Sequence, residues 1–489
     1  MPLQDLAAPF DSPREACGVI GIWDASGTFN LPDYLVLGLT ELQHRGQESA
    51  GIAVCAGDSI ETRVGMGKVR EVFPHGAGEM RASVGIGHVR YSTTGSSCVQ
   101  NAGPFLVGRH GEVRDQLALA HNGNVSNSDE LAMLLGDVTL DSTTDSEIVA
   151  HLLLAAKGET FVDRMRSVIP LLRGAYSFVI LSGGKLYGLR DPLGMRPLCL
   201  GTLGRGWILA SESGAIEKLG GAYERDVRPG ELIEIGEDGL ISTQLVERER
   251  HAFCSFEYIY FAGAASSFDG RSVYAVRQEL GRQLAHEHPA PGADVVSGVP
   301  DSAVPAAIAY AAEVGLPYTE AFIKSRYSER SFIKPDQRLR RLEVDLKFSI
   351  VRHNVAGKSV VLVDDSIVRG NTMKRAIAAL RNYGAREVHL RISSPPLRNP
   401  CFYGIDIGSD EDLIAAHADT ERIAAYIGAD SLGYLSLEGL AQAVTLSRGE
   451  AAGPRFHNGH CYGCFQAQGY PYSAHSAFEE QRERALASV

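Results

Sequence analysis

Several features that would place this chain in a membrane, in a secreted fluid or on nucleic acid are missing from its 489 residues. No apolar run is long enough to span a bilayer. The first residues, MPLQDLAAPFDSPREACGVIG, contain neither the basic stretch nor the apolar stretch of a secretory signal. Basic residues are outnumbered, with a net charge of −12, which argues against general nucleic-acid binding. We therefore expect a cytoplasmic protein with no membrane or nucleic-acid partner.

Cysteine is sparse, with eight residues in the whole chain. In a reducing compartment disulfides are rare, so any cysteine with a role is expected to be a nucleophile or a metal ligand. Cys55, Cys98 and Cys199 stand among small or apolar residues, which favours the interpretation that they are buried hydrophobic side chains.

The chain divides into two patterns that predict two domains. From Cys17 to about residue 250, short apolar runs with frequent glycine predict a β-rich layer, with helices near 31–44 and 145–157. From 251 to about 470, strands and helices alternate, which predicts a parallel α/β sheet with helices near 302–314 and 372–383. Residues 1–16 form a leader without periodicity, and 471–489 form a tail.

Residues suited to attack on a carboxamide are scattered over the first half. Cys17 is a candidate nucleophile, and Asn122 with Gly123 offers two N–H donors for a tetrahedral oxyanion. Arg90 can bind a carboxylate, and Asp145 can bind an ammonium group. Each residue also has a structural interpretation: a surface charge for Arg90, a hairpin turn for Asn122–Gly123 and a helix N-cap for Asp145.

The strings LQHRGQESAGI, GHVRYSTTG, LAHNGN and STTDSE together resemble the glutamine amidotransferase domain of the N-terminal-nucleophile class, an αββα fold. The resemblance implies that Cys17 is the nucleophile and that its own freed α-amine is the base. It implies glutamine binding by Arg90 and Asp145, an oxyanion hole of Asn122 and Gly123, and positioning by Arg45. Residues 1–16 would then be a propeptide, because an internal cysteine has no free amine.

The most specific string of the chain is KSVVLVDDSIVRGNTMKRA, residues 358–376. An apolar strand ends in two carboxylates, and the following loop can cradle a phosphate at a helix N-terminus. Asp364 and Asp365 would repel that phosphate, so they suit ribose hydroxyls or Mg²⁺. A plain solvated loop is the alternative.

This string resembles the 5-phosphoribosyl 1-pyrophosphate (PRPP) motif of type I phosphoribosyltransferases. SGVPDSA, residues 297–303, fits a pyrophosphate loop. The basic segment 324–341, seven Lys or Arg against two acids, fits a lid over pyrophosphate, with a solvated basic face as the alternative. The implied PRPP contacts are Asp364, Asp365, Ser366, Arg369, Gly370, Thr372, Lys324 and Arg326, and the implied Mg²⁺ ligands are Ser302, Asp364 and Asp365.

The two halves together resemble the glutamine phosphoribosylpyrophosphate amidotransferase family, which opens purine synthesis. The resemblance implies conversion of glutamine and PRPP to 5-phosphoribosylamine, glutamate and pyrophosphate, in a homotetramer inhibited by purine nucleotides. Two rivals stay open. One is the same glutaminase domain with a sugar-isomerase or asparagine-forming partner, which DDSIVRGNT disfavours; the other is a non-catalytic PRPP-binding regulator.

Four further cysteines are candidate metal ligands. Cys461 and Cys464 form a C-x-x-C pair, whose spacing alone suits zinc, redox chemistry or no function. AFCSFEY and RNPCFYGID, with Cys254 and Cys401, resemble the family subset that has a propeptide and a 4Fe-4S cluster. Four thiolates suit such a cluster, and zinc is the chemical alternative.

Overall fold

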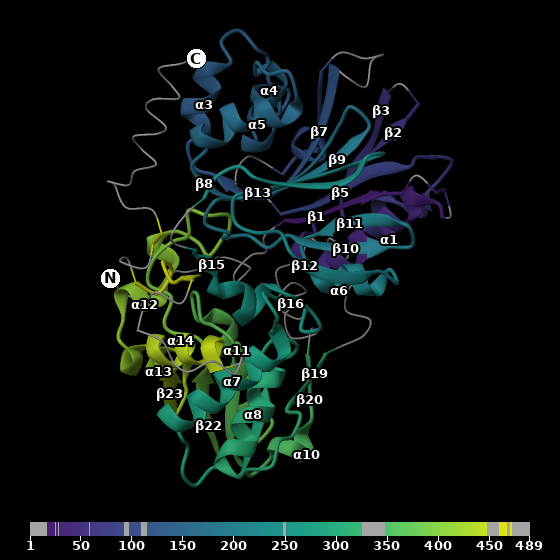
Figure 1. The fold of residues 1–489 in the computed structure, drawn as a ribbon. Coiled ribbons are helices and arrows are strands. Elements are labelled where there is room, and N and C mark those ends of the chain that lie inside the picture. Colours follow the sequence, from purple (N-terminus) through teal and green to yellow (C-terminus); the bar gives the residue numbers. More distant parts are fainter. Residues whose placement is uncertain are drawn as a thin grey trace.

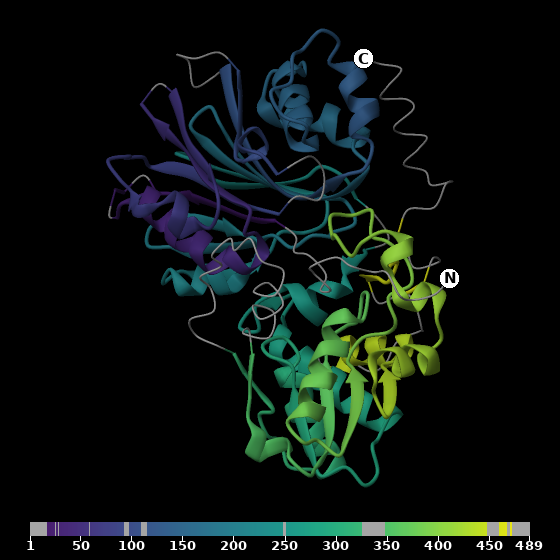
Figure 2. The same ribbon diagram turned by 180° about the vertical axis from the view of Figure 1, so that it is seen from behind.

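Two bodies of secondary structure are joined at one long boundary, with the elements of residues 17–244 above and those of residues 251–461 below in Figures 1 and 2. The structure is a computed structural model. It describes residues 17–24, 26–27, 29–57, 59–91, 97–108, 115–247, 251–324, 348–446, 459–466 and 470–471. The expected propeptide 1–16 and nearly all of the 471–489 tail lie outside the described residues. Among the described helices, none has the length and apolar character needed to cross a membrane.

The first layer of the upper body is a seven-stranded antiparallel sheet in the order β12-β10-β11-β1-β5-β2-β3. Its strands are β1 (Gly18–Trp23), β2 (Ser49–Ala56), β3 (Ser59–Met66), β5 (Val84–Arg90), β10 (Cys199–Leu203), β11 (Gly206–Ala210) and β12 (Ala222–Asp226). The helix predicted near 31–44 is α1 (Leu31–Glu41), continued by the 3-10 turn η1 (Leu42–Arg45). It covers the outer face together with α6 (Ser213–Lys218), while α2 (Val69–Val72) and β4 (Pro74–Ala77) lie at the edge.

The second layer is a six-stranded antiparallel sheet in the order β14-β13-β9-β8-β7-β6. Its strands are β6 (Phe105–Gly108), β7 (Gln116–Val125), β8 (Gly174–Ser182), β9 (Lys185–Arg190), β13 (Glu231–Gly236) and β14 (Gly239–Gln244). Its outer face carries α3 (Ser128–Leu134), α4 (Asp145–Ala155) and α5 (Phe161–Val168). Alternate side chains of both sheets, such as Val19, Ile86 and Val179, form the apolar core between them. The predicted αββα arrangement is confirmed.

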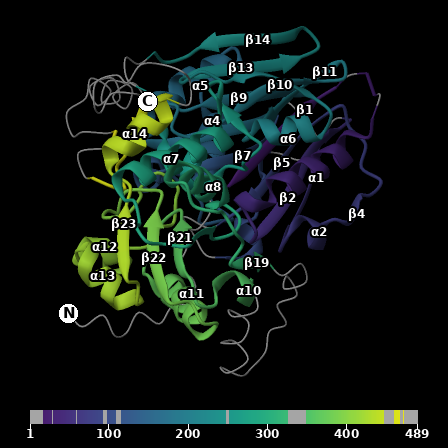
Figure 3. The ribbon, with the colours of Figure 1, turned by 90° about the horizontal axis from the view of Figure 1, so that it is seen from below.

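The lower body is built on a parallel sheet in the order β18-β21-β22-β23. These strands are β18 (Val295–Gly298), β21 (Ser359–Asp364), β22 (Glu387–Ile392) and β23 (Ser431–Tyr434). One face packs on α7 (Val273–Glu287), α8 (Val304–Val314) and α14 (Leu437–Leu446), and the other on α11 (Asn371–Asn382) and α13 (Thr420–Ile427), as Figure 3 shows from below. The prediction of a parallel α/β sheet is confirmed, with α8 and α11 as the two expected helices.

Short elements complete the lower body and tie it to the upper one. β15 (Phe253–Cys254) pairs in parallel with β24 (His460–Cys461), and the π-helix η5 (Glu257–Phe261) follows β15. β16 (Ser267–Phe268) pairs with β17 (Arg271–Ser272), and β19 (Phe322–Lys324) pairs with β20 (Phe348–Ile350). Two short helices complete the lower body. Along the chain, α10 (Arg352–Val355) lies between β20 and β21, and α12 (Ile414–His417) lies between β22 and α13.

Candidate active sites

Cys17 stands immediately before β1 and is buried at the boundary between the two bodies. Its thiol donates to the carbonyl oxygen of Tyr91 at 3.6 Å. Burial raises the pKa of the Cys17 thiol above its usual value, although the Tyr91 contact and the charge of Arg90 act in the opposite direction. A thiol in this state attacks an amide only if a base takes its proton.

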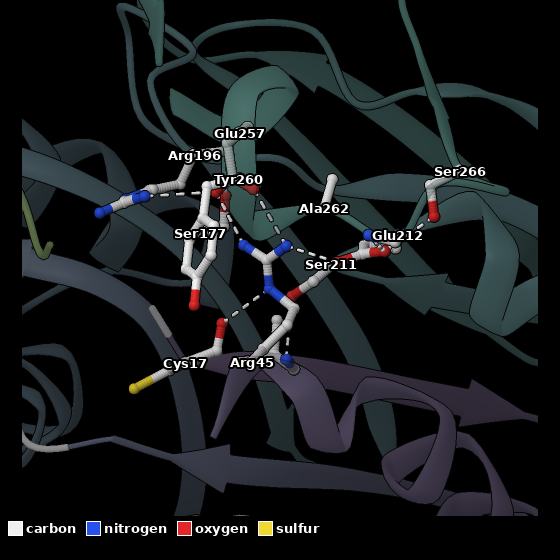
Figure 4. A network of polar contacts seen from close by, with 12 residues as sticks. Cys17, Arg45, Ser177, Arg196, Ser211, Glu212, Glu257, Tyr260, Ala262 and Ser266 are labelled. Carbon is white, nitrogen blue, oxygen red and sulfur yellow. Dashed lines mark hydrogen bonds and ion pairs between the residues drawn. The ribbon is translucent and has the colours of Figure 1, made fainter. Parts of the chain in front are cut away.

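The backbone of Cys17 is held by the buried side chain of Arg45. Arg45 Nε donates to the Cys17 carbonyl at 3.2 Å, and its Nη1 pairs with Glu212 Oε1 at 2.5 Å. Glu257, in η5 of the lower body, accepts from Nη1 at 3.0 Å and from Nη2 at 2.7 Å. Figure 4 shows Arg45 between these partners, with Arg196 on the far side of Glu257. The predicted positioning residue therefore belongs to a network that crosses the domain boundary.

Asn122 and Gly123 lie inside β7, where they pair with Ser177 and Tyr176 of β8. The hairpin-turn interpretation is thus wrong. Among the described residues, neither the nitrogen nor the oxygen of the Asn122 side-chain amide, both buried, has a hydrogen-bond partner. A fully buried amide without partners is costly, so its presence points to a ligand that supplies them.

Arg90 ends β5 and is 5% exposed, so the surface-charge interpretation is wrong. Asp145 is the first residue of α4, but the N-cap is Thr144, whose side chain accepts from the Glu147 N–H. The N-cap interpretation of Asp145 is therefore wrong as well. Asp145 Oδ2 accepts from the Val125 N–H at 2.7 Å. Arg90 and Asp145 both act electrostatically on the Cys17 thiol, in opposite directions, so the fold brings all three together.

The carboxylate of Asp145 is kept in its charged form by its surroundings. Burial alone would raise its pKa, but His121 and the hydrogen bonds from Val125 and Ser146 outweigh that effect and lower it. His121 Nδ1 lies 3.6 Å from Asp145 Oδ2 and 3.0 Å from Ser146 Oγ. A charged carboxylate in this pocket is suited to hold an ammonium group.

His88 is a second buried histidine near Arg90 and Asp145, and neither His88 nor His121 was among the residues predicted from the sequence. Burial and the neighbouring Arg90 lower the pKa of His88 to about 3, so its ring is neutral. The signal that could have found it is a titratable residue inside an otherwise apolar strand, GHVR in β5. Arg196 gave a similar signal in the segment GMRPL, and it is 1% exposed.

The acidic pair of the lower body lies at the carboxyl end of β21. Ser302, from the loop after the adjacent strand β18, donates to Asp365 Oδ2 at 2.5 Å, and Ser366 Oγ donates to Asp365 Oδ1 at 2.7 Å. Burial raises the pKa of the Asp365 carboxyl. The structure thus brings Ser302, Asp364 and Asp365 to one edge of the parallel sheet, where ligands of such sheets bind.

The loop after the acidic pair leads into the N-terminus of α11. Gly370 is its N-cap with φ of 82°, a left-handed conformation that favours glycine, and Thr372 follows in the first turn. Arg369 pairs with Asp412 through Nη2 at 2.7 Å and Nε at 2.9 Å. Lys324, at the end of β19, pairs with Asp301 Oδ2 at 2.6 Å. Arg326 and the rest of the predicted basic lid lie outside the described residues.

The four cysteines Cys254, Cys401, Cys461 and Cys464 line one pocket at the domain boundary. Cys254 and Cys461 are opposite each other in the β15–β24 pair, and Cys401 Sγ accepts from the Tyr403 N–H at 3.3 Å. Burial raises the pKa of the Cys254 thiol to about 12 and raises those of Cys461 and Cys464 further. Buried thiols of this kind are inert unless a bound cation stabilises their thiolates.

The lining of this pocket restricts the kind of metal group that could bind there. Within the described part of the chain, no three His, Cys, Asp or Glu side chains are gathered closely enough to hold a single ion. The four thiols nevertheless share one lining, with apolar side chains such as Ile405 and Ile407 and the cation of Arg196. This donor set fits a group that is larger than one ion and is ligated by four thiolates.

Comparisons with known proteins identify a match for each of the two bodies. A family model described as a glutamine amidotransferase domain matches residues 108–218, and one described as a phosphoribosyl transferase domain matches 280–393. Amidophosphoribosyltransferase of Archaeoglobus fulgidus is 46% identical, over 94% of this chain and 98% of its own length. The enzyme of Bacillus subtilis is 42% identical, over 94% of each chain.

Solved structures give the same result for the whole fold. The glutamine PRPP amidotransferase of B. subtilis, complexed with ADP and GMP, superposes with a TM-score of 0.86 at 41% identity, covering 94% of this chain and 98% of that one. A second structure, titled the allosteric regulatory enzyme of purine biosynthesis, also superposes with a TM-score of 0.86, at 40% identity. This chain, with its thiol pocket in one body and its acidic strand end in the other, belongs to the amidophosphoribosyltransferase family.

Proposed function

We propose that this chain hydrolyses glutamine at Cys17 and transfers the ammonia to PRPP, forming 5-phosphoribosylamine, glutamate and pyrophosphate in the first committed step of purine synthesis. The observation that carries the proposal is that the buried Cys17 thiol lies within electrostatic reach of Arg90 and Asp145, which act on it in opposite directions. The buried Asn122 amide, which has no hydrogen-bond partner among the described residues, supports it. Glutamine hydrolysis needs a thiol nucleophile, donors for the oxyanion, and groups that bind the α-carboxylate and the α-ammonium of the substrate. Cys17, Asn122, Arg90 and Asp145 can supply these in that order.

The glutamine reaction follows from these positions. Arg90 binds the α-carboxylate and Asp145 the α-ammonium group, and the Cys17 sulfur attacks the side-chain amide carbon. The thiol proton passes to the α-amine of Cys17 and then to the leaving ammonia. The Asn122 side-chain N–H and the Gly123 backbone N–H stabilise the oxyanion, a contribution of about 10²–10³ in kcat per donor in such sites. Water then releases glutamate from the thioester.

This mechanism needs a free α-amine on Cys17, so we propose that residues 1–16 are removed as a propeptide. The α-amine has a pKa of roughly 7.7–8.0, which lets it accept a proton near neutral pH. A peptide nitrogen at the same place cannot do so. The raised pKa of the buried thiol makes such a base more necessary.

At the second site, Asp364 and Asp365 would bind the ribose hydroxyls of PRPP, and the loop into α11 would bind its 5-phosphate. The N-terminus of α11 follows the N-cap Gly370 and offers backbone N–H groups and the residue Thr372 in its first turn, and Ser366 would add a hydroxyl from the preceding loop. Ammonia attacks the ribose C1 and pyrophosphate leaves, with Lys324 and Arg326 as its basic contacts. Ser302, Asp364 and Asp365 offer the oxygen ligands that Mg²⁺ prefers, and the ion would neutralise pyrophosphate charge.

We further propose that Cys254, Cys401, Cys461 and Cys464 hold a 4Fe-4S cluster with a structural role. Their common pocket and their number support it. The cluster would fasten the junction at Cys254 to the C-terminal segment at Cys461, over 200 residues later. Zinc with four thiolates is the chemical alternative, but the spacing of the described ligating side chains favours a group larger than one ion.

Regulation, assembly and location are also proposals. The B. subtilis relative was solved with ADP and GMP, which supports feedback inhibition of this chain by purine nucleotides. We propose a homotetramer in the cytoplasm, on family resemblance and on the absence of a bilayer-spanning segment from the sequence.

One assay separates this function from a non-catalytic PRPP-binding regulator. Purified protein is given glutamine with and without PRPP, and glutamate and pyrophosphate are measured. We expect both products in equal amounts, with glutamate release rising when PRPP is added. PRPP binding without either product would favour the regulator. Glutamate release at the same rate with and without PRPP would favour the rival in which the glutaminase domain serves a sugar-isomerase or asparagine-forming domain.

A further inference from the structure

The backbone of Gly404, in the lower body, lies close to the backbone of Gly123 in the proposed oxyanion hole. A Cβ atom built on Gly404 would lie 2.7 Å from the Gly123 carbonyl carbon, 2.9 Å from its Cα and 2.9 Å from its oxygen. These are backbone atoms, which cannot swing aside as a flexible side chain would. Gly404 also has φ of 91°, so a larger residue there is strained by its own backbone as well.

Gly123 is also closely approached by the neighbouring strand β8. Gly123 has φ of 145°, and a Cβ built on it would lie 2.0 Å from the Ala175 carbonyl oxygen of β8. The backbone of Gly123 therefore lies close both to β8 and to Gly404. Two backbones approach it at distances that only glycine permits.

The residues just before Gly404 are fastened to the glutaminase body. The Phe402 carbonyl accepts from Asn124 Nδ2 at 2.9 Å, next to Gly123. The Tyr403 carbonyl accepts from Arg196 Nε at 3.0 Å and Nη2 at 2.8 Å. The Tyr403 side chain shares a small apolar cluster with Ala175.

The same segment begins at a thiol of the four-cysteine pocket. Cys401 Sγ accepts from the Tyr403 N–H, and both residues line that pocket. Figures 1 and 2 show the yellow-green chain after residue 400 rising to the lower edge of the upper body. One run of four residues thus joins the cysteine pocket to the wall of the oxyanion hole.

We propose that the segment Cys401–Gly404 is a positioning element for glutamine hydrolysis, in which Gly404 fixes the backbone of Gly123 so that its N–H points at the oxyanion. This inference rests on the proposed function, because it takes the oxyanion role of Gly123 from it. It adds that the lower body completes the glutaminase site and that Gly404 is required as glycine. The segment begins at Cys401, which lines the cysteine pocket. Disorder in that pocket would therefore also displace Gly404, three residues later, and with it the backbone of Gly123.

The test is Gly404→Ala in the full chain. We expect kcat for glutamine hydrolysis to fall by about 10-fold or more, since a displaced oxyanion donor costs up to about 10²–10³. KM for glutamine should change little, because the proposed glutamine-binding side chains Arg90 and Asp145 are unchanged in this variant. Phosphoribosylamine formation from free ammonia should remain. A γ-aldehyde analogue of glutamine, which forms a tetrahedral adduct with Cys17, should lose affinity by a similar factor, while product glutamate should bind as before.

The matched control is Gly428→Ala. Gly428 has φ of 81°, similar to that of Gly404, and an added Cβ there meets nothing within 4 Å. It therefore carries the backbone strain without the contact. A drop in kcat for both variants, or aldehyde affinity unchanged in Gly404→Ala, would overturn the positioning role. If the parent enzyme itself released no glutamate, the proposed function would fail instead. Asn124→Leu, which removes the bond to Phe402, should weaken aldehyde binding in the same direction if Gly404→Ala does not fold.

Discussion

Arg45 and Glu257 form a bidentate ion pair across the domain boundary, with Nη1–Oε2 at 3.0 Å and Nη2–Oε1 at 2.7 Å. Both side chains are fully shielded from solvent. Burial would lower the pKa of Arg45, but Glu257 and Glu212 outweigh burial and raise it, so the guanidinium stays charged. Because Arg45 also holds the Cys17 carbonyl, this pair connects the nucleophile to the segment that follows Cys254.

Glu257→Gln should destabilise the enzyme, because it leaves Arg45 and Arg196 buried with one carboxylate fewer. Removing one partner of a buried pair costs about 3–5 kcal/mol in the free energy of unfolding. The denaturant midpoint should fall clearly, and glutamine hydrolysis should fall with it. The control is Glu279→Gln, whose partner Arg282 is exposed and whose loss should cost about 0–1 kcal/mol. Equal midpoints for the two variants would contradict a structural role for the network.

Two variants should separate the two reactions. Cys17→Ala should abolish glutamine hydrolysis and keep phosphoribosylamine formation from ammonia, because Asp364 and Asp365 lie in the other body. Asp364→Asn or Asp365→Asn should abolish phosphoribosylamine formation from either nitrogen source. The products are measured directly. A folded Cys17→Ala protein that lost the ammonia reaction would show that the two sites are not independent.

Active enzyme should begin at Cys17, since the proposed base is the α-amine of that residue. Intact mass and N-terminal sequencing of the active fraction should show a chain lacking residues 1–16. A fully active chain that still begins at Met1 would remove the α-amine as the base.

The four pocket cysteines should bind iron and sulfide in anaerobically purified protein, with a broad visible absorption. Replacing Cys254, Cys401, Cys461 or Cys464 by Ser should abolish the absorption and give misfolded or proteolysed protein, because metal-binding free energy contributes to folding. Exposure to oxygen should bleach the protein and inactivate it. Cys55→Ser is the control, since Cys55 lies in β2, away from the pocket. Stoichiometric zinc without iron would replace the cluster and leave the rest of the proposal intact.

His88 should make the enzyme less stable in acid. Its pKa is about 3 in the folded chain, so between roughly pH 6.5 and 3 the unfolded chain binds a proton that the folded chain does not. Stability from His88 is therefore complete above pH 6.5 and falls as pH drops, by about 1.4 kcal/mol per pH unit inside that window.

His88→Asn should flatten this acid slope, measured as denaturant midpoint against pH. His286→Asn serves as the control, because His286 is 60% exposed. An unchanged slope in His88→Asn would mean that other groups cause the acid loss.

The local strings of the sequence were sufficient for the fold class. VVLVDDSIVRGNT contains a strand, its acidic end and a helix start in contiguous residues, so their arrangement is set by local geometry. The same holds for the alternation that predicted α8 and α11. The family resemblance then assigned roles to Cys17, Arg90 and Asp145.

Only the tertiary structure brought together residues that are far apart in the chain. Arg45 meets Glu257 at a separation of 212 residues, and Gly404 meets Gly123 at an even larger one. The structure also places Asn122 and Gly123 within β7, whereas the sequence was compatible with a hairpin turn at these residues. It makes Thr144 the N-cap of α4, whereas the sequence was compatible with Asp145 in that role. Such contacts depend on strand register and on how the two bodies pack. Hydrophobic periodicity fixes which face of a strand is buried, but it does not fix which distant backbone lies against it.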